Sequence, residues 1–156
     1  MKQEEYLAAI KKQQSLIRKL FASRKRRSEC IDEITRERYG HLVGKFFKAP
    51  KGDNRFRSVD EDTTLYICGV YAESNYAMSD EAYVCIVCRY ISQSYQLFGD
   101  KKIVRGFESY SQSFRFGMDD NLDEILAPLY IPEEKAAKEV SEIYNAFIDK
   151  FLKKGQ

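Results

Sequence analysis

Hydrophobic positions near the start of the chain recur with a seven-residue period. Residues 3–38 contain neither proline nor glycine and are rich in residues that favour helices. Within this segment, apolar residues occupy the a and d positions of a coiled-coil seam. We therefore predict a long N-terminal helix that dimerises through residues 3–22, with four oligomerisation residues on its seam: Tyr6, Ile10, Ile17 and Leu20.

Four later segments have the composition of β-strands. Their expected ranges are 41–48, 64–71, 82–97 and 102–116, and the last two form a hairpin that turns at Gly99 and Asp100. Strands as long as these two usually bend, and Gly106 is the expected site. The second and third strands are apolar on both faces, which indicates that both faces are covered, either by closure of a barrel or by helices.

Residues 132–154 carry the signals of a C-terminal helix. Pro132 stands in its first turn, acidic residues follow at the positive end of the helix dipole, and Gly155 closes it. Its buried stripe is expected to consist of Ala136, Val140, Ile143, Phe147 and Phe151. A short helical turn over residues 122–127 is expected before it, capped by Asp119, Asp120 or Asn121.

These elements together predict an α+β fold with one globular domain. A long basic helix over residues 1–38, with coiled-coil character, precedes a β domain over residues 39–156. The β domain is expected to hold a four-stranded antiparallel sheet, curled toward a small barrel, and the packed C-terminal helix over residues 132–154.

Composition narrows the class of protein. The chain has 156 residues, of which 44% are hydrophobic and 32% are charged, and these values exclude a disordered chain and a membrane protein. No apolar run approaches the ~18–20 residues that span a bilayer. The first residues lack an apolar signal core, so we expect a soluble cytoplasmic protein with no membrane partner.

The net charge of +2 hides an uneven distribution. Residues 1–48 hold 13 Lys and Arg against 6 Asp and Glu, residues 49–100 hold 4 against 8, and residues 101–156 hold 9 against 10. The densest basic run is Arg24, Lys25, Arg26 and Arg27, which interrupts the apolar seam and can neutralise phosphates without reading sequence. The alternative is that this run is solvated or pairs with the acidic body.

Arginines also alternate with aromatic residues along the predicted strands. Aromatic faces set among cations are the chemistry of single-stranded nucleic-acid platforms. Arg105-Gly106-Phe107 matches the first three positions of the RNP1 pattern, although Glu108 and Ser109 depart from it. We take four residues as candidates for an exposed platform: Arg105, Phe107, Tyr110 and Arg115. The alternative is that these rings belong to the core.

No pattern in the chain predicts catalysis or a metal site. Cys85 and Cys88 are three residues apart on a predicted strand and so point to opposite faces. His41 is the only histidine, and the acidic runs lack the spacing of an EF-hand loop. We expect no enzyme, no cofactor, no catalytic residue and no metal, with the four cysteines serving as small core residues.

The segment Val43-Gly44-Lys45-Phe46-Phe47-Lys48, followed by the strand Leu65–Val70, resembles a loose set of small phage and mobile-element proteins. In that set a G-K-aromatic-aromatic-K strand opens a compact β domain behind a coiled coil, and the likeness covers about residues 40–116. The resemblance implies no shared activity, only a context in which small non-enzymatic proteins bind a host machine or its nucleic acid, as anti-CRISPR proteins do.

Two functions follow as hypotheses. The first is a non-catalytic protein that engages RNA or a ribonucleoprotein through its basic helix, as a phage-encoded inhibitor of a host defence machine such as an anti-CRISPR protein. The second is a coiled-coil assembly or adaptor module that binds a protein partner.

Overall fold

The structure is a computed structural model that describes residues 2–74 and 81–154; the side chains of residues 93–95, 102, 104, 105, 107, 147 and 150–154 lie outside the description. The elements, in chain order, are α1 (Lys2–Tyr39), η1 (Gly40–Leu42), β1 (Phe46–Lys48), η2 (Asn54–Phe56), β2 (Thr64–Ser74), β3 (Ala82–Phe98), β4 (Lys101–Gly117), α2 (Leu122–Leu126), η3 (Ala127–Leu129), β5 (Tyr130–Ile131) and α3 (Glu133–Lys154). The α+β class and both long helices are as predicted.

The sheet differs from the prediction in strand number and in shape. It is an open antiparallel sheet of five strands in the order β4-β3-β2-β1-β5, not a four-stranded sheet curled into a barrel. The fifth strand, β5, has only two residues and pairs with β1, so it was too short to show as a sequence pattern. β4 and β5 form the two edges and do not pair with each other, which leaves the sheet open.

The first predicted strand, 41–48, is mostly wrong. Residues Gly40–Leu42 form the 3-10 turn η1, and only Phe46–Lys48 extend as strand β1. Between them Gly44 adopts a φ of +94°, a left-handed conformation that glycine tolerates and that turns the chain onto β2. The Gly44 amide donates to the Ile67 carbonyl at 2.8 Å, which is where pairing with β2 begins.

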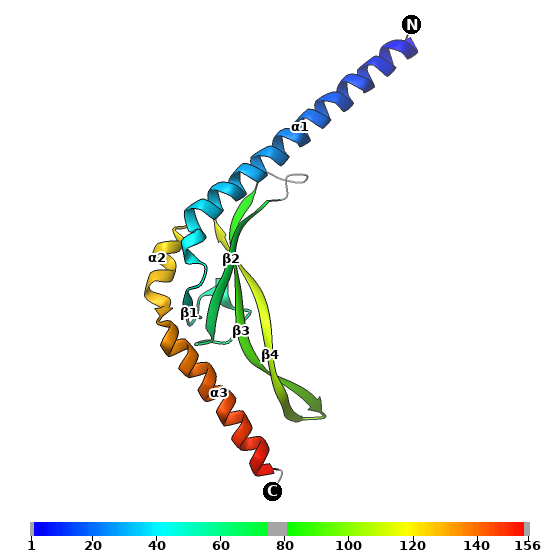
Figure 1. The fold of residues 1–156 in the computed structure, drawn as a ribbon. Helices are drawn as coiled ribbons and strands as arrows, with labels where there is room; N and C mark the ends of the chain where they lie inside the picture. Colours follow the sequence, from blue (N-terminus) through cyan, green and yellow to red (C-terminus); the bar gives the residue numbers. More distant parts are fainter. Residues whose placement is uncertain (1, 75–80, 155–156) are drawn as a thin grey trace.

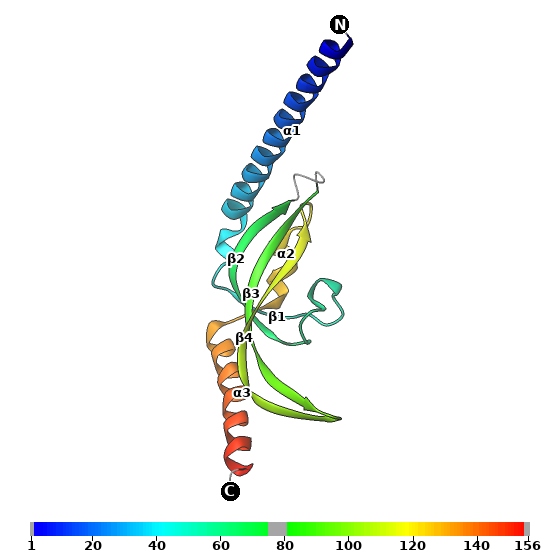
Figure 2. The same ribbon diagram turned by 90° about the vertical axis from the view of Figure 1, so that its right-hand side faces the viewer.

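The long hairpin of β3 and β4 matches its prediction closely. Phe98 pairs with Lys101 across a turn in which Gly99 has a φ of +60°. The register shifts where Ser94 pairs with Gly106 and Tyr95 pairs with Val104, so the bulge lies beside Gly106 as expected. The far half of the hairpin extends beyond the body as an arm (Figures 1 and 2).

The core lies on one face of the sheet. α2, the loop that contains η2, and the end of α1 cover this face. The fully buried large side chains come from all of these elements: Tyr39, Leu42, Phe47, Phe56, Leu65, Ile67, Ile86, Phe114, Phe116, Leu122 and Leu126. The expected cap of α2 is present, since the Asn121 side chain accepts from the Glu124 amide at 3.4 Å.

Helix α1 is anchored at its C-terminal end and free at the other. Beyond the short β1, the outer edge of β2 is covered by α1, and Asp32 Oδ1 accepts a hydrogen bond from the Ala72 amide at 2.8 Å. Thr35 and Tyr39 are buried in the same contact. From Lys2 to Ser23 every residue is exposed except Ile10, which is half-buried. This free part of α1 projects away from the sheet (Figure 1).

Helix α3 starts directly after Pro132, as predicted, and leaves the body at the other end of the molecule (Figure 1). Ala136 is fully buried and Val140 is half-buried. The expected burial of Ile143 is wrong, because its side chain is 46% exposed. The expected stripe members Phe147 and Phe151 lie outside the described side chains. Among the described side chains beyond the first two turns, only Ile148 is half-buried, and the others are exposed.

Candidate functional site

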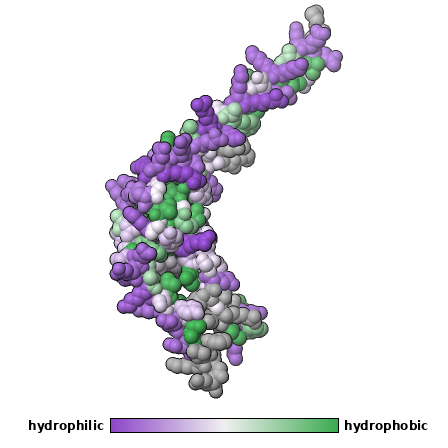
Figure 3. All heavy atoms as spheres, viewed as in Figure 1, coloured by the Kyte–Doolittle hydropathy of each residue, from purple (hydrophilic) through white to green (hydrophobic). Residues whose placement is uncertain are grey.

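The free part of α1 carries an exposed apolar stripe. The stripe consists of large side chains between 41% and 66% exposed: Tyr6, Leu7, Ile17, Leu20 and Phe21. Their spacing places them, with the half-buried Ile10, on one side of the helix. Figure 3 shows apolar atoms along this projecting part. Three of the four predicted oligomerisation residues, Tyr6, Ile17 and Leu20, are thus exposed large apolar groups on a common side.

The opposite side of the same segment is basic. Residues 2–27 hold nine Lys and Arg against two Glu. Helical spacing places five of these cations outside the stripe, and all five are exposed: Lys11, Lys12, Arg18, Lys19 and Arg26. Of the predicted basic run, Arg24 is half-buried, and Arg24 and Arg27 both take part in interactions within the chain. Arg26 is therefore the member of this run that the basic side presents, while Lys25 is exposed at the border of the stripe, in line with Leu7.

The predicted aromatic platform on β4 is not assembled on one face. Tyr110 and Arg115 are five residues apart in a regular stretch of strand, so their side chains point to opposite faces. Tyr110 stacks on Tyr90 with ring centroids 5.7 Å apart and donates to Glu108 Oε2 at 2.8 Å. Arg105 and Phe107 lie outside the described side chains. Because side chains alternate between the two faces of a strand, the odd spacing of Tyr110 and Arg115 in the sequence already places them on opposite faces.

Arg115 is held by an acidic partner. Its guanidinium lies 5.5 Å from the Tyr83 ring centroid and donates from Nη2 to Glu73 Oε1 at 2.8 Å. The hydrogen bonds that Arg115 donates to Glu73, together with the charge of Glu73, raise the pKa of Arg115 above its ordinary value. The positive charge of Arg115 is thus matched within the sheet, and Arg115 is a weaker candidate for a phosphate contact.

Sequence reasoning missed a groove between α3 and the outer face of the sheet, which we call the α3 groove. Its apolar part has a volume of about 460 Å³ and is lined by Phe46, Ile91, Ala137, Val140 and Tyr144, among others. Two adjoining hollows of about 380 and 220 Å³ share Ile91 and Val140 with it. The signal that pointed to it is the apolar Phe46 on the strand face opposite the buried Phe47.

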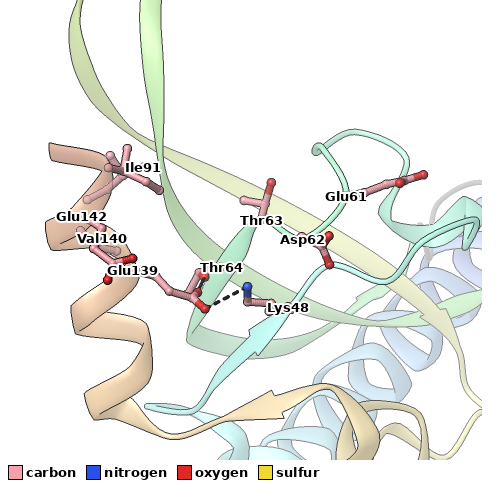
Figure 4. A pocket seen from close by; sticks show the side chains of 10 residues that line it. Lys48, Glu61, Asp62, Thr63, Thr64, Ile91, Glu139, Val140 and Glu142 are labelled. Atoms are coloured by element: carbon pink, nitrogen blue, oxygen red, sulfur yellow. Dashed lines mark hydrogen bonds and ion pairs between the residues drawn. The ribbon is translucent and has the colours of Figure 1, made fainter. Parts of the chain in front are cut away.

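The rim of the α3 groove is acidic. Glu61, Asp62, Glu139 and Glu142 line the hollow shown in Figure 4, and Glu133 lines the apolar part. The cations in the lining are Lys48 and Arg89. Lys51 lies outside the lining, and its Nζ is 3.9 Å from Glu61 Oε2, with both groups mostly exposed. The rim therefore keeps a net negative charge.

One polar contact fixes α3 to the sheet inside this groove. Lys48 Nζ lies 2.9 Å from Glu139 Oε1 (Figure 4), and Thr64 Oγ1 donates to Glu139 Oε2 at 2.8 Å. Partial burial acts to raise the pKa of Glu139, but the hydrogen bonds from Lys48 and Thr64 outweigh it, so that the pKa lies below its ordinary value. The charged form of Glu139 is thus part of the anchor.

The expectation that all four cysteines are core residues is wrong for Cys30, which is exposed, and Cys68 is only half-buried. Cys85 and Cys88 are both buried, and burial raises the pKa of Cys85 to about 11 and that of Cys88 still further. His41 lies in η1, where Nε2 is 2.6 Å from Asp123 Oδ1. Within residues 2–74 and 81–154, no group of three or more His, Cys, Asp or Glu is placed to hold a metal ion.

Comparison with protein-family models, with curated proteins and with solved structures gives no match. The resemblance to small mobile-element proteins therefore stays a prediction. None of the described helices is both long enough and apolar enough to cross a membrane.

Proposed function

We propose that the protein is an assembly module that associates with further copies of itself through the free part of α1. The observation that carries the proposal is the exposed stripe of Tyr6, Leu7, Ile17, Leu20 and Phe21. A helix that stands alone in water has little to stabilise it, because most helical stability in proteins comes from packing an apolar face. A row of large apolar side chains on such a helix is typical of an interaction surface.

The assembly hypothesis is favoured over RNA binding by the sheet residues. Arg115 is paired with Glu73, and Tyr110 faces the other side of the strand. Binding of RNA or of a ribonucleoprotein, as by an inhibitor of a host defence machine, is the second proposal. The exposed basic side of α1, which includes Arg26, supports it. The two proposals are compatible, since they use opposite sides of one helix.

Light scattering on the purified chain over a range of concentrations tests the first proposal. We expect the wild type to be larger than a monomer and the double variant Ile17→Asp, Leu20→Asp to be monomeric. The matched control is Ser15→Asp, Ala22→Asp, which adds the same two charges at exposed positions on the other side of the helix. A wild type that stays monomeric at every concentration, or a control that dissociates equally, contradicts the proposal.

A salt titration of RNA binding tests the second proposal. Each phosphate contact contributes about 0.7 to the slope of log K against log salt for single strands. The variant Lys25→Glu, Arg26→Glu should therefore flatten the slope, whereas Lys135→Glu, Lys138→Glu on α3 should leave it unchanged. Equal slopes for both variants, or no retention of RNA by the wild type, would contradict RNA binding through α1.

A further inference from the structure

We infer that the free part of α1 docks in the α3 groove of a second copy, so that copies join head to tail. This inference rests on the proposed assembly function and names its acceptor. The alternative within the same function is a symmetric pair in which the stripe of one α1 packs on the stripe of another.

The first argument is the placement of the two surfaces. The free part of α1 and the α3 groove lie toward opposite ends of the molecule (Figure 1). The rest of α1 is fixed along β2 by the Asp32–Ala72 hydrogen bond and by buried Thr35 and Tyr39. The stripe therefore cannot fold back onto the groove of its own chain while α1 stays a continuous helix. The two surfaces can meet only between copies.

The second argument is the match of chemistry. The floor of the groove is apolar and includes Phe46, Ile91 and Val140, which fit an apolar stripe. Its rim carries Glu61, Asp62, Glu133, Glu139 and Glu142, against the cations Lys48 and Arg89. Among the described residues, no ion pair involves Asp62, Glu133 or Glu142. By helical spacing, Lys2 and Lys25 lie at the borders of the stripe and Arg18 lies just outside it, so these exposed cations bring the opposite charge to this rim.

A symmetric pair of α1 helices is less well matched. Two such segments packed stripe to stripe bring the cations that border the stripe, such as Lys2 and Lys25, close to those of the other copy, and like charges repel. The seam is also short, because Gln13 interrupts it and Arg24 ends it. Coiled coils gain their stability from several uninterrupted heptads.

The third argument is length. The part of α3 that lines the groove, from Glu133 to Tyr144, spans ~17 Å at 1.5 Å per residue. The stripe from Tyr6 to Phe21 spans ~23 Å on the same scale. Three of its four turns can therefore lie along the groove. Because the stripe and the groove are different surfaces, a joined pair still has one free stripe and one free groove, and the contact propagates into a chain of copies.

The test mixes two defective variants. Ile17→Asp, Leu20→Asp removes the donor stripe and leaves the groove intact. Ala137→Arg fills the groove from an exposed position on α3 and leaves the stripe intact. The matched control for the groove is Asn145→Arg, an exposed position one quarter turn past the groove lining. Size and mass are measured by light scattering for each variant and for the mixture.

We expect Ala137→Arg to weaken self-association by about tenfold or more, and Asn145→Arg to leave it near the wild-type level. Mixing Ala137→Arg with the stripe variant should yield a one-to-one heterodimer that grows no further, which also shows that both variants are folded. If Ala137→Arg assembles like the wild type, or if the mixture stays monomeric, head-to-tail docking is overturned while self-assembly stands. A monomeric wild type overturns the proposed function itself.

Discussion

The guanidinium of Arg115 on β4 reaches across β3 to the carboxylate of Glu73 on β2, with Nε 2.9 Å from Oε2 and Nη2 2.8 Å from Oε1. This bidentate ion pair fixes both side chains on the outer face of the sheet. The positive charge of Arg115 already has a counter-charge, so a phosphate would have to compete with Glu73.

The first prediction concerns this pair. We expect Arg115→Gln to leave RNA retention and its salt slope unchanged, because the charge it removes is matched inside the protein. Glu73→Gln should strengthen retention, since it releases Arg115 on an exposed face. Both are measured in the same salt titration as the α1 variants. A slope flattened by Arg115→Gln as much as by Lys25→Glu, Arg26→Glu would show that Arg115 contacts phosphate directly.

The second prediction concerns thiol reactivity. The thiolate is the reactive form, and burial raises the pKa of Cys85 to about 11, so at pH 8 only about a thousandth of it is ionised. Cys88 is also buried with a raised pKa, whereas Cys30 is exposed. Alkylation with iodoacetamide, read by peptide mass, should label Cys30 first and reach Cys85 and Cys88 only after unfolding. Labelling of Cys85 at the rate of Cys30 would contradict its burial.

The third prediction concerns pH and the anchor of α3. The folded-state pKa of Glu139 lies below its ordinary value, which in unfolded chains is about 4.3. Its ionised form therefore stabilises the fold fully above that pH, and the contribution is lost as the pH falls through the folded-state pKa. Glu139→Gln should lower the free energy of unfolding by about 1 kcal/mol at pH 7 and by less in acid.

Urea unfolding at a series of pH values and equal protein concentration measures this difference. Glu134→Gln removes an exposed carboxylate from the first turn of the same helix and serves as the control, with a smaller expected effect at pH 7. A Glu139→Gln deficit that stays constant into acid would mean that the charge of Glu139 does not stabilise the contact with Lys48 and Thr64.

The fourth prediction concerns the edge of β2. Asp32→Ala removes the acceptor of the Ala72 amide, leaving a partly buried N–H without its partner, and should cost about 1–2 kcal/mol of unfolding free energy. Asp32→Asn keeps an acceptor oxygen and should cost less. Hydrogen exchange at the Ala72 amide measures the contact directly: it should speed up strongly in the alanine variant. Unchanged exchange would show that α1 does not protect this edge.

How far the sequence predicts this molecule depends on how local each signal is. The two long helices and the β3–β4 hairpin rest on periodicity, caps and Gly99, which act within a few residues, and their ends fall within about two residues of the expected ones. The two-residue β5 exists only because β1 lies beside it, and the residues before Phe46 turn away at Gly44. Such pairings depend on tertiary contacts that no local pattern records.

The same distinction applies to the candidate site. The spacing of Tyr6, Ile17 and Leu20 predicts the seam of α1. Whether these side chains are exposed depends on how far the rest of the chain extends along α1, which the spacing does not show. The α3 groove combines Phe46, Ile91 and Val140 from three elements, and nothing in their separate neighbourhoods links them. Arg115 and its charge partner Glu73 are 42 residues apart in sequence, so no local sequence pattern predicts that they pair.

The fifth prediction concerns the loop between β1 and β2, where Phe56 fills the core. Its ring is fully buried against Phe47, Phe114 and Phe116, with centroids 5.7, 4.9 and 5.9 Å away. The Asp53 side chain, which accepts from the Arg55 amide at 2.9 Å, starts the 3-10 turn that aims it inward. Because the cavity left by a buried ring closes only in part, Phe56→Ala should cost about 3–5 kcal/mol of unfolding free energy.

Urea unfolding of the full chain measures this cost. Arg57→Ala, the next residue and exposed, is the matched control and should change the unfolding free energy by about 0.5 kcal/mol or less. Phe56→Leu keeps most of the apolar volume, so its cost should fall between the two. If Phe56→Ala costs no more than Arg57→Ala, the loop does not contribute to the core. The aromatic ring would then be open to the surface role that its neighbouring arginines suggest.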